Sequence, residues 1–248
     1  MDLGQKQMNN NDRYKRNIAI KEIGIEGQKK LKNSKILICG AGGLGSTVIS
    51  NLASIGIGNI GIIDYDLIEI SNLNRQYIHK FKSIGEKKVI SAKIWINDFN
   101  NQIKVDTYDI KLNLDNYSEI VKKYDLIIDC FDSYHSKFIL NTIAIKSKKI
   151  LIHAGVSEFY GQVTSIIPHH TPCLNCIIPF TLTDEKEIPK GVISPIVSTI
   201  ASIQSLEAIK LILNIGDPLV NHLLIFNGLN MSFKKIFLKK NPKCKVCN

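Results

Sequence analysis

Short apolar runs alternate with longer amphipathic stretches through the first two-thirds of the chain. Apolar runs with little polar alternation are typical of strands that are buried on both faces. We expect strands at Lys35–Cys39, Asn59–Ile63, Val105–Asp109, Leu126–Asp129 and Ile150–His153. Helices are expected at Leu44–Ile55, Lys87–Phe99 and Ser133–Lys146. This alternation predicts an α/β fold with a Rossmann-like, doubly wound and mostly parallel sheet.

The pattern changes after Gly155. The segments Gly161–Ile167 and His222–Phe226 are predicted strands, and Met231–Leu238 alternates in part as an antiparallel strand does. A long helix is expected to begin near Pro195, after a loop rich in Pro, Thr and Lys. We interpret this region as a continuation of the same domain, in which antiparallel strands extend the parallel sheet.

Two N-terminal segments precede the sheet. Residues 1–12 are polar and rich in Asn, so we expect a disordered tail and no secretory signal. Residues 12–31 carry apolar side chains at helical spacing, which predicts an N-terminal helical arm. The remainder, residues 13–248, is expected to form a single domain.

The formal charge of +10 raises the question of a nucleic-acid partner. Most of the cations are lysines dispersed among Ile and Asn, which favours compositional bias over a binding stripe. The longest apolar segment, Ser194–Leu213, is interrupted by polar residues such as Gln204 and Glu207, so it is predicted to be a buried helix. We therefore expect a cytoplasmic protein that binds neither nucleic acid nor membrane.

Four glycines follow the first predicted strand and open the first helix of the sheet: Gly40, Gly42, Gly43 and Gly45. Glycines at such a turn let backbone N–H groups approach phosphates, and the helix N-terminus adds a favourable dipole. Asp64 closes the second strand, nineteen residues beyond Gly45, where a carboxylate accepts hydrogen bonds from ribose hydroxyls. The combination predicts an adenine nucleotide, without separating NAD from ATP.

Charged residues after the strands favour ATP. Arg75 lies in a hydrophilic loop after the second strand, and Lys88 opens the following helix. Nucleotidyl transfer needs such cations to offset charge that gathers on the phosphates. Asp132 follows the strand Leu126–Asp129 and is expected to face the phosphates, where a carboxylate suits Mg²⁺.

Four of the six cysteines form two C-x-x-C pairs, about seventy residues apart. They are Cys173, Cys176, Cys244 and Cys247. Four thiolates complete a tetrahedral Zn²⁺ site, although a redox pair or unpaired thiols are alternatives. The other two, Cys39 and Cys130, lie in apolar runs and are expected to be buried core residues.

Several motifs follow one another in a characteristic order from residue 13 to the C-terminus. They are Arg13–Arg16, Glu22–Gln28, the glycine loop, Ser71–Gln76, Asp129–Asp132, Gly161–Val163, Gly191–Pro195 and Gln204–Lys210. In this order they resemble the MoeB/ThiF/HesA family, the bacterial relatives of the ubiquitin-activating enzymes. The resemblance implies an ATP-dependent adenylyltransferase that activates the C-terminal Gly carboxylate of a small ubiquitin-like sulfur-carrier protein.

The resemblance also implies roles for individual residues. The four glycines would hold ATP, with Asp64 on the ribose, Asp132 on Mg²⁺, and Asn72, Arg75 and Lys88 on the phosphates. Arg16 would reach the partner subunit's site in a homodimer. Residues 179–194 would form a crossover loop over the carrier's Gly-Gly tail. The cysteine pairs would bind a structural zinc that clips the C-terminal tail to the domain.

One position departs from the family pattern. Many relatives have a cysteine in the crossover loop where this chain has Glu187, so we predict no covalent carrier–enzyme intermediate. Sulfur would come from a separate persulfide-bearing protein. The carrier and its pathway, thiamine or molybdopterin, stay open. The alternatives are a peptide or natural-product carboxylate as substrate, an NAD-dependent oxidoreductase, and a nucleotide-binding scaffold. The histidines are assigned no role.

Overall fold

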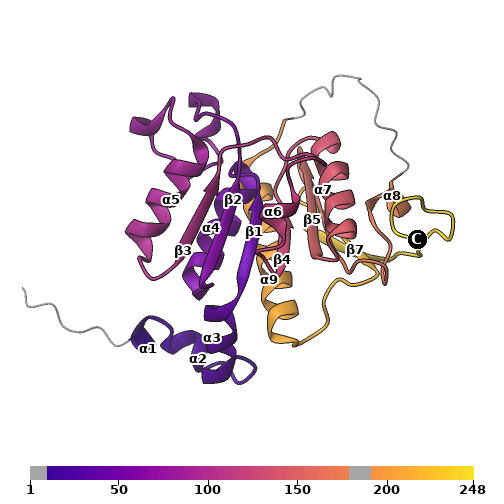
Figure 1. Cartoon of the computed structure of the whole chain (residues 1–248), viewed down its shortest axis with the longest axis horizontal. Coiled ribbons are helices and arrows are strands. Elements are labelled where there is room, and N and C mark those ends of the chain that lie inside the picture. The colour runs from indigo at the N-terminus through magenta and orange to yellow at the C-terminus, as the bar shows by residue number, and fades with distance from the viewer. Residues whose placement is uncertain (1–9, 179–190) are drawn as a thin grey trace, which may run out of the picture.

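A computed structural model of the chain describes residues 10–178 and 191–248. Within these residues the strands form one eight-stranded sheet in the order β3-β2-β1-β4-β5-β6-β7-β8 (Figure 1). The strands are β1 (Lys35–Cys39), β2 (Asn59–Ile63), β3 (Lys104–Tyr108), β4 (Leu126–Asp129), β5 (Ile150–Ser157), β6 (Tyr160–Ile166), β7 (His222–Asn227) and β8 (Ser232–Phe237). The predicted fold class is confirmed.

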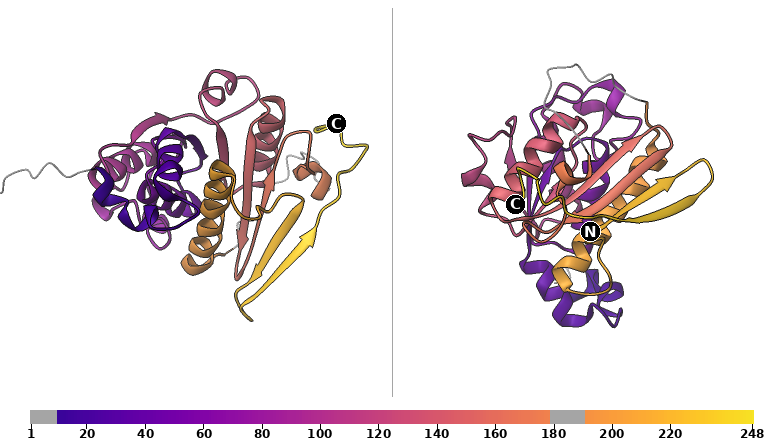
Figure 2. Two further views of the ribbon diagram at one scale, coloured as in Figure 1. Left: turned by 90° about the horizontal axis from the view of Figure 1, so that it is seen from below. Right: turned by 90° about the vertical axis from the view of Figure 1, so that its right-hand side faces the viewer.

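The sheet has a parallel half and an antiparallel half. Strands β1 to β5 pair in parallel, and β6, β7 and β8 continue the sheet from β5 in antiparallel pairs. Figure 2 shows the β7–β8 hairpin as a twisted ribbon at one edge, in yellow. The chain first adds β2 and β3 on one side of β1 and then returns to place β4 on its other side. Ligands of open α/β sheets bind at such a reversal, outside the carboxyl ends of the strands.

Helices connect the strands and cover the sheet. They are α4 (Gly43–Ile55), α5 (Lys88–Phe99), α6 (Ser118–Val121), α7 (Tyr134–Lys146), α8 (Leu174–Ile177) and α9 (Ser194–Leu213), with the 3-10 turns η1 (Ile70–Asn72) and η2 (Phe81–Ser83). The N-terminal arm consists of α1 (Asn10–Arg13), α2 (Lys15–Ile18) and α3 (Gly24–Asn33). The described part of the arm starts with Asn10, and residues 1–9 of the expected disordered tail lie outside the described residues.

Alternate residues of the central strands enter two apolar cores, one on each face of the sheet. In β1, Ile36 and Ile38 pack with α4, α5 and α9, whereas Leu37 and Cys39 pack with α6 and α7. All four side chains are fully buried. This two-sided burial explains why β1 is an apolar run without polar alternation.

Helix α9 is a core helix of this domain. It has 20 residues, and an 18-residue window within it has a mean hydropathy of 1.5, so the helix is long and apolar enough for a membrane span by length and composition alone. Half of that window is buried inside the protein, because α9 packs on α4, β5 and β6 (Figure 2). Residues such as Ile196, Ile200 and Ala201 belong to the larger apolar core. The predicted buried helix is therefore confirmed.

Candidate functional site

The glycine loop connects β1 to α4 and packs directly against the end of β4. Gly40 has a φ of +105°, and a Cβ there would lie 2.5 Å from the Cys130 carbonyl oxygen. A Cβ on Gly45 would overlap the carbonyl oxygen of Gly40. Gly42 is the N-cap of α4, and because it has no side chain, it does not cap the N–H groups of the first turn. The first turn of the helix thus presents backbone N–H groups and a positive dipole end, which suit a phosphate.

Two buried side chains form hydrogen bonds with the backbone of Ala41, in the middle of this loop: one binds its N–H and the other its carbonyl. Asp64 Oδ2 accepts a 2.7 Å hydrogen bond from the Ala41 N–H, and its Oδ1 accepts one from Asp66 N at 2.8 Å. His79 Nε2 lies 2.9 Å from the Ala41 carbonyl oxygen. Because a carbonyl only accepts, His79 donates from Nε2 and its Nδ1 accepts from the Ser91 hydroxyl at 3.0 Å. Burial lowers the pKa of His79, in agreement with this neutral form.

Lys88 lies beside Asp64 at the start of α5. It is only 6% exposed, and its Nζ is 2.7 Å from Asp66 Oδ2. Burial raises the pKa of Asp64, and the Lys88 ammonium opposes that rise. An ammonium has three donors, so Lys88 keeps donors for an anion in addition to its ion pair with Asp66.

The loop after β2 carries Asn72 and Arg75. The Asn72 side chain is buried and its Oδ1 accepts a 3.0 Å hydrogen bond from Glu69 N, which shapes the η1 turn. The Arg75 guanidinium donates to the Ser71 carbonyl at 3.0 Å. A Cβ on Gly43 would lie 3.6 Å from Arg75 Cγ and Cδ, so the arginine stem lies against the start of α4. Arg75 is half-buried, and its guanidinium also donates to Asn74 Oδ1 at 2.9 Å.

Asp132 is exposed and lies in the short connection between β4 and α7. Burial raises the pKa of Tyr65, and the carboxylates of Asp66, Asp132 and Asp64 add to that rise. Asp129 is paired with Cys39 at the ends of β4 and β1, so the connection that carries Asp132 leaves the sheet beside the glycine loop. The structure thus gathers the glycine loop, Asp64, Asn72, Arg75, Lys88 and Asp132 at the carboxyl ends of β1, β2 and β4.

Arg16 does not lie with these residues in the same subunit. It is exposed on α2, in the arm that packs below the sheet in Figure 1. Its neighbour Tyr14 contacts Gly56 at the end of α4 and accepts a 2.8 Å hydrogen bond from Asn100 Nδ2. Both partners precede strands, so they mark the amino edge of the sheet, opposite the glycine loop.

The two cysteine pairs come together in the antiparallel half, where the chain end lies beside α8 (Figure 1). Cys173 Sγ is 3.7 Å from Cys244 Sγ, and Cys176 Sγ is 3.5 Å from Cys247 Sγ. All four sulfurs lie within 4.8 Å of one another. A Zn–S bond of about 2.3 Å puts tetrahedral sulfurs about 3.8 Å apart, whereas a disulfide bond is about 2.05 Å long. The donor set and spacing therefore fit a zinc ion.

Most of the predicted crossover loop lies outside the described residues. This applies to residues 179–190, which include Glu187. The described part begins at Gly191, whose carbonyl accepts a 2.6 Å hydrogen bond from Glu158 N. The end of the loop is thereby joined to the turn between β5 and β6.

Comparison with known proteins identifies the family. The sequence pattern of the ThiF family matches residues 14–246. The chain belongs to the ThiF family. The predicted resemblance is thus confirmed over nearly the whole chain.

Proteins similar in sequence to this chain include named adenylyltransferases. A sulfur carrier protein adenylyltransferase of Thermus thermophilus is 33% identical over 246 residues, which cover 95% of this chain and 90% of that protein. The adenylyltransferase and sulfurtransferase MOCS3 of Aedes aegypti is 37% identical and matches 98% of this chain. The chain spans 57% of that longer protein. The crystal structure of E. coli MccB with ATP has a TM-score of 0.82 at 26% identity, and the match covers 96% of this chain and 75% of MccB.

Sequence reasoning missed some residues that shape this ThiF-family site. His79 was assigned no role, and Asp129 and Lys137 were not considered as a pair. Each makes its contacts with segments far away in the chain, such as Ala41 for His79, 38 positions earlier. No local pattern of residues signals such a contact.

Proposed function

We propose that the chain is an ATP-dependent adenylyltransferase that activates the C-terminal Gly carboxylate of a small ubiquitin-like sulfur-carrier protein. The observation that carries this proposal is the convergence of the glycine loop with Arg75, Lys88 and Asp132 at the carboxyl ends of β1, β2 and β4. Membership of the ThiF family and the named adenylyltransferase relatives support it.

In the proposed reaction a carboxylate oxygen of the carrier attacks the α-phosphorus of ATP. A new O–P bond forms, and the bond from that phosphorus to the bridging oxygen breaks. Pyrophosphate leaves with the electron pair, and the carrier becomes an acyl-adenylate. The ionised carboxylate has no proton to lose, so the step needs no general base. The chain contributes positioning and positive charge.

Each charged residue has a proposed part in that step. The N–H groups of the glycine loop and Asn72 would bind phosphate oxygens, with the cations Arg75 and Lys88 beside them. Asp64 would accept from the ribose, since each of its oxygens has a second lone pair besides the one used by backbone N–H. Exposed Asp132 would hold Mg²⁺, which offsets charge on the phosphates when bound.

Arg16 would act in the partner subunit of a homodimer. Its exposure at the amino edge of the sheet supports this, because a guanidinium there does not lie near the glycine loop of its own chain. Mixing Arg16→Ala with Arg75→Ala subunits tests the idea. A mixed dimer then has one site with both arginines, so mixing should restore about a quarter of the wild-type rate. Arginines that act within one chain would give no restoration.

The four cysteines would hold one structural Zn²⁺ that clips the C-terminal tail to the domain. The short distances among their sulfurs support this assignment. A closed four-thiolate site has no open position for a substrate, so the ion would serve stability and not catalysis. Elemental analysis of freshly purified protein should find about one equivalent of zinc. A value below about half an equivalent would count against the site.

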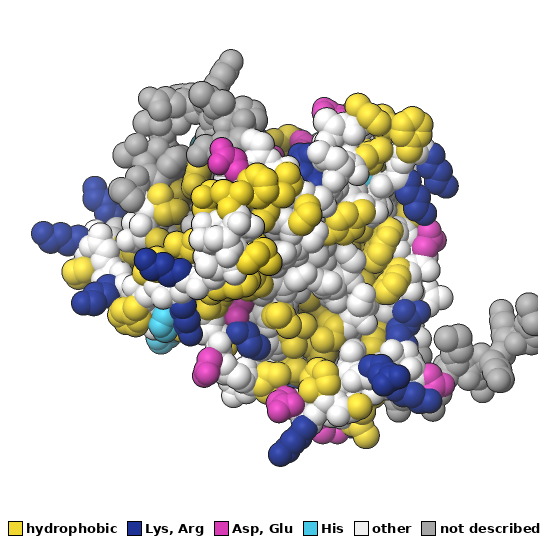
Figure 3. All heavy atoms as spheres, turned by 180° about the vertical axis from the view of Figure 1, so that it is seen from behind, with side chains coloured by type: hydrophobic (Ala, Val, Ile, Leu, Met, Phe, Trp, Pro, Cys, Tyr) yellow, Lys and Arg dark blue, Asp and Glu magenta, His cyan; other side chains and the backbone are white. Residues whose placement is uncertain are grey.

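The remaining parts of the proposal concern partners. Sulfur would come from a separate persulfide-bearing protein in thiamine or molybdopterin biosynthesis. We propose a cytoplasmic protein with no nucleic-acid or membrane partner. Figure 3 supports the expectation of no nucleic-acid partner, since the Lys and Arg side chains on the face that it shows are scattered and form no stripe.

ATP–pyrophosphate exchange tests the central proposal. The purified chain is incubated with Mg²⁺, ATP, labelled pyrophosphate and one Gly-Gly-ending carrier at a time. Exchange that depends on one carrier supports adenylation and identifies the pathway. A second candidate substrate is a peptide carboxylate, favoured by the similarity to MccB structures solved with MccA. Exchange with peptides alone would favour that candidate, and tight NADH binding without exchange would favour an oxidoreductase.

A further inference from the structure

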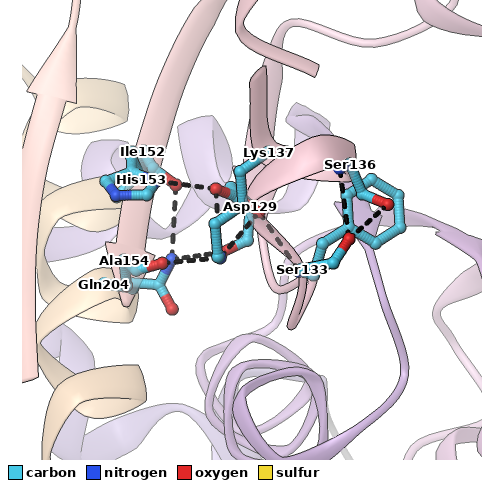
Figure 4. A network of polar contacts seen from close by, with 9 residues as sticks. Asp129, Ser133, Ser136, Lys137, Ile152, His153, Ala154 and Gln204 are labelled. Atoms are coloured by element: carbon cyan, nitrogen blue, oxygen red, sulfur yellow. Dashed lines mark hydrogen bonds and ion pairs between the residues drawn. The ribbon is translucent and has the colours of Figure 1, made fainter. Parts of the chain in front are cut away.

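The polar cluster around Asp129 is a charged group in the core that the proposed reaction does not use. Asp129 ends β4 and has no exposed surface. Lys137 Nζ lies 3.3 Å from each of its carboxylate oxygens, and His153 Nδ1 lies 2.7 Å from Oδ2 (Figure 4). The Phe131 N–H donates to Oδ1 at 3.1 Å. Every oxygen of this buried carboxylate is thus hydrogen-bonded.

The cluster is a buried ion pair with a neutral histidine. Burial alone raises the pKa of Asp129, but Lys137 and the hydrogen bond from His153 outweigh burial and hold that pKa below its usual value. Burial lowers the pKa of His153, so its Nδ1 is the donor and its Nε2 is an acceptor. That Nε2 has no partner among the described residues. Lys137 also donates to the Ala154 carbonyl at 2.8 Å, which joins α7 to β5.

The ion pair closes a short loop that carries Asp132. The loop leaves β4 at Asp129, passes Asp132 and enters α7, and Lys137 brings it back to Asp129. Ser133 caps α7 by accepting a 3.2 Å hydrogen bond from Ser136 N. Asp132 therefore lies between Asp129, whose carboxylate is bound to Lys137 in the first turn of α7, and Ser133, the N-cap of that helix.

The same loop is fixed on its other side against the glycine loop. The Cys130 N–H donates to the Cys39 carbonyl at 2.8 Å, and the Cys130 carbonyl lies against Gly40. Gln204 on α9 donates to the Asp129 carbonyl at 2.9 Å. These contacts fix the backbone on the Asp129 side of Asp132, and the ion pair with Lys137 links that side to α7 on the other.

We propose that Lys137, through its ion pair with Asp129, is a positioning residue that fixes the Asp132 carboxylate for Mg²⁺ in the nucleotide complex. Lys137 is buried, and its ammonium donates to Asp129 and to the Ala154 carbonyl, so in this proposal it acts through Asp129. The inference rests on the proposed function, because it takes Asp132 as the magnesium ligand. Residues behind metal ligands commonly change metal affinity by about 10–100-fold when they are removed.

The test is metal binding, measured apart from turnover. Mn²⁺ binding to the full-length protein with α,β-methylene-ATP is followed by electron paramagnetic resonance. Lys137→Met should raise the dissociation constant of Mn²⁺ about tenfold or more, and Lys137→Arg should restore it to within about threefold. Lys146→Met, an exposed lysine on the same helix, should leave it unchanged. The Mg²⁺ concentration for half-maximal exchange should rise in parallel.

Two further variants keep the outcome decisive. If Lys137→Met does not fold because Asp129 loses its counter-charge, the double variant Asp129→Asn/Lys137→Met removes both charges and is measured instead. Asp132→Ala separates the two proposals. If Asp132→Ala binds Mn²⁺ normally, the magnesium assignment fails. If Asp132→Ala weakens binding while Lys137→Met or the double variant only lowers the melting temperature, the positioning role is overturned.

Discussion

The two halves of the sheet hold their functional side chains in different ways. In the parallel half, the proposed nucleotide-binding residues already have protein partners, as in the hydrogen bonds of Asp64 with Ala41 and of Lys88 with Asp66. In the antiparallel half, each cysteine pair meets its counterpart 71 residues away, sulfur against sulfur. The nucleotide side is therefore ordered by the fold itself, whereas the cysteine side fits an added ion.

This difference implies that the two regions respond separately to mutation. The glycine loop lies between β1 and α4, while the cysteines pack with the core that includes α6 and α7. The hydrogen bonds of Asp64 and Lys88 share no residue with the sulfur–sulfur contacts of the cysteines, and sites without shared partners usually contribute nearly additively. We therefore expect changes on the nucleotide side to alter activity and changes on the cysteine side to alter the C-terminal tail.

The largest effect is expected for Arg75→Ala. Loss of a cation beside the phosphates should lower carrier-dependent ATP–pyrophosphate exchange by about 100-fold or more. Asp132→Ala should have an effect of the same order. Arg13→Ala, which removes an arginine over the Phe99 ring, is the matched control and should keep most of the activity. Wild-type exchange by Arg75→Ala at saturating ATP would contradict the proposed site.

A second prediction concerns the order that the fold imposes on the glycine loop. Asp64→Asn replaces one of two acceptor oxygens with a donor, so the N–H of Ala41 or of Asp66 loses its partner. A buried donor without a partner costs about 1–3 kcal/mol, which urea unfolding should detect. Asp98→Asn, an exposed site on α5, is the control. Equal stability of the two variants would show that the loop does not depend on Asp64.

Metal removal tests the other side of the comparison. Chelation of zinc, or Cys244→Ser, should increase trypsin cleavage after the lysines of residues 239–245 about tenfold, because the tail loses its attachment. Cys130→Ala removes a cysteine outside the cluster and should not change this cleavage. Exchange activity should fall by less than about threefold. A parallel loss of exchange would show that the two halves are coupled.

The smallest effect is a pH dependence of stability. Burial lowers the pKa of His153 in the folded protein, so on acidification the unfolded chain binds this proton first. Its contribution is therefore complete above about pH 6.5, the unfolded value, and is lost as the pH falls toward the folded value. The slope is at most about 1.4 kcal/mol per pH unit. His153→Asn keeps a donor to Asp129. In this variant the melting temperature should depend less on pH between pH 7 and 5 than in the wild type. An unchanged slope would refute this origin.

The sequence alone determined most of the parallel half. The predicted strands Lys35–Cys39, Asn59–Ile63 and Leu126–Asp129 match β1, β2 and β4 residue for residue. Burial on both faces makes each of them a continuous apolar run bounded by polar residues, so the signal is local. The glycine loop, Asp64 and Asp132 follow strand ends for the same reason, since parallel strands bring their carboxyl ends to one edge.

Only the tertiary structure decided the rest. Strand β5 continues to Ser157, beyond the predicted His153, because β6 pairs with it there and supplies hydrogen bonds that no local pattern records. The neutral form of His79 and the Asp129–Lys137 pair depend on contacts between segments that are distant in the chain and on burial. Charge state and partner choice follow from the surroundings that folding creates, and for that reason residue type and spacing alone did not reveal them.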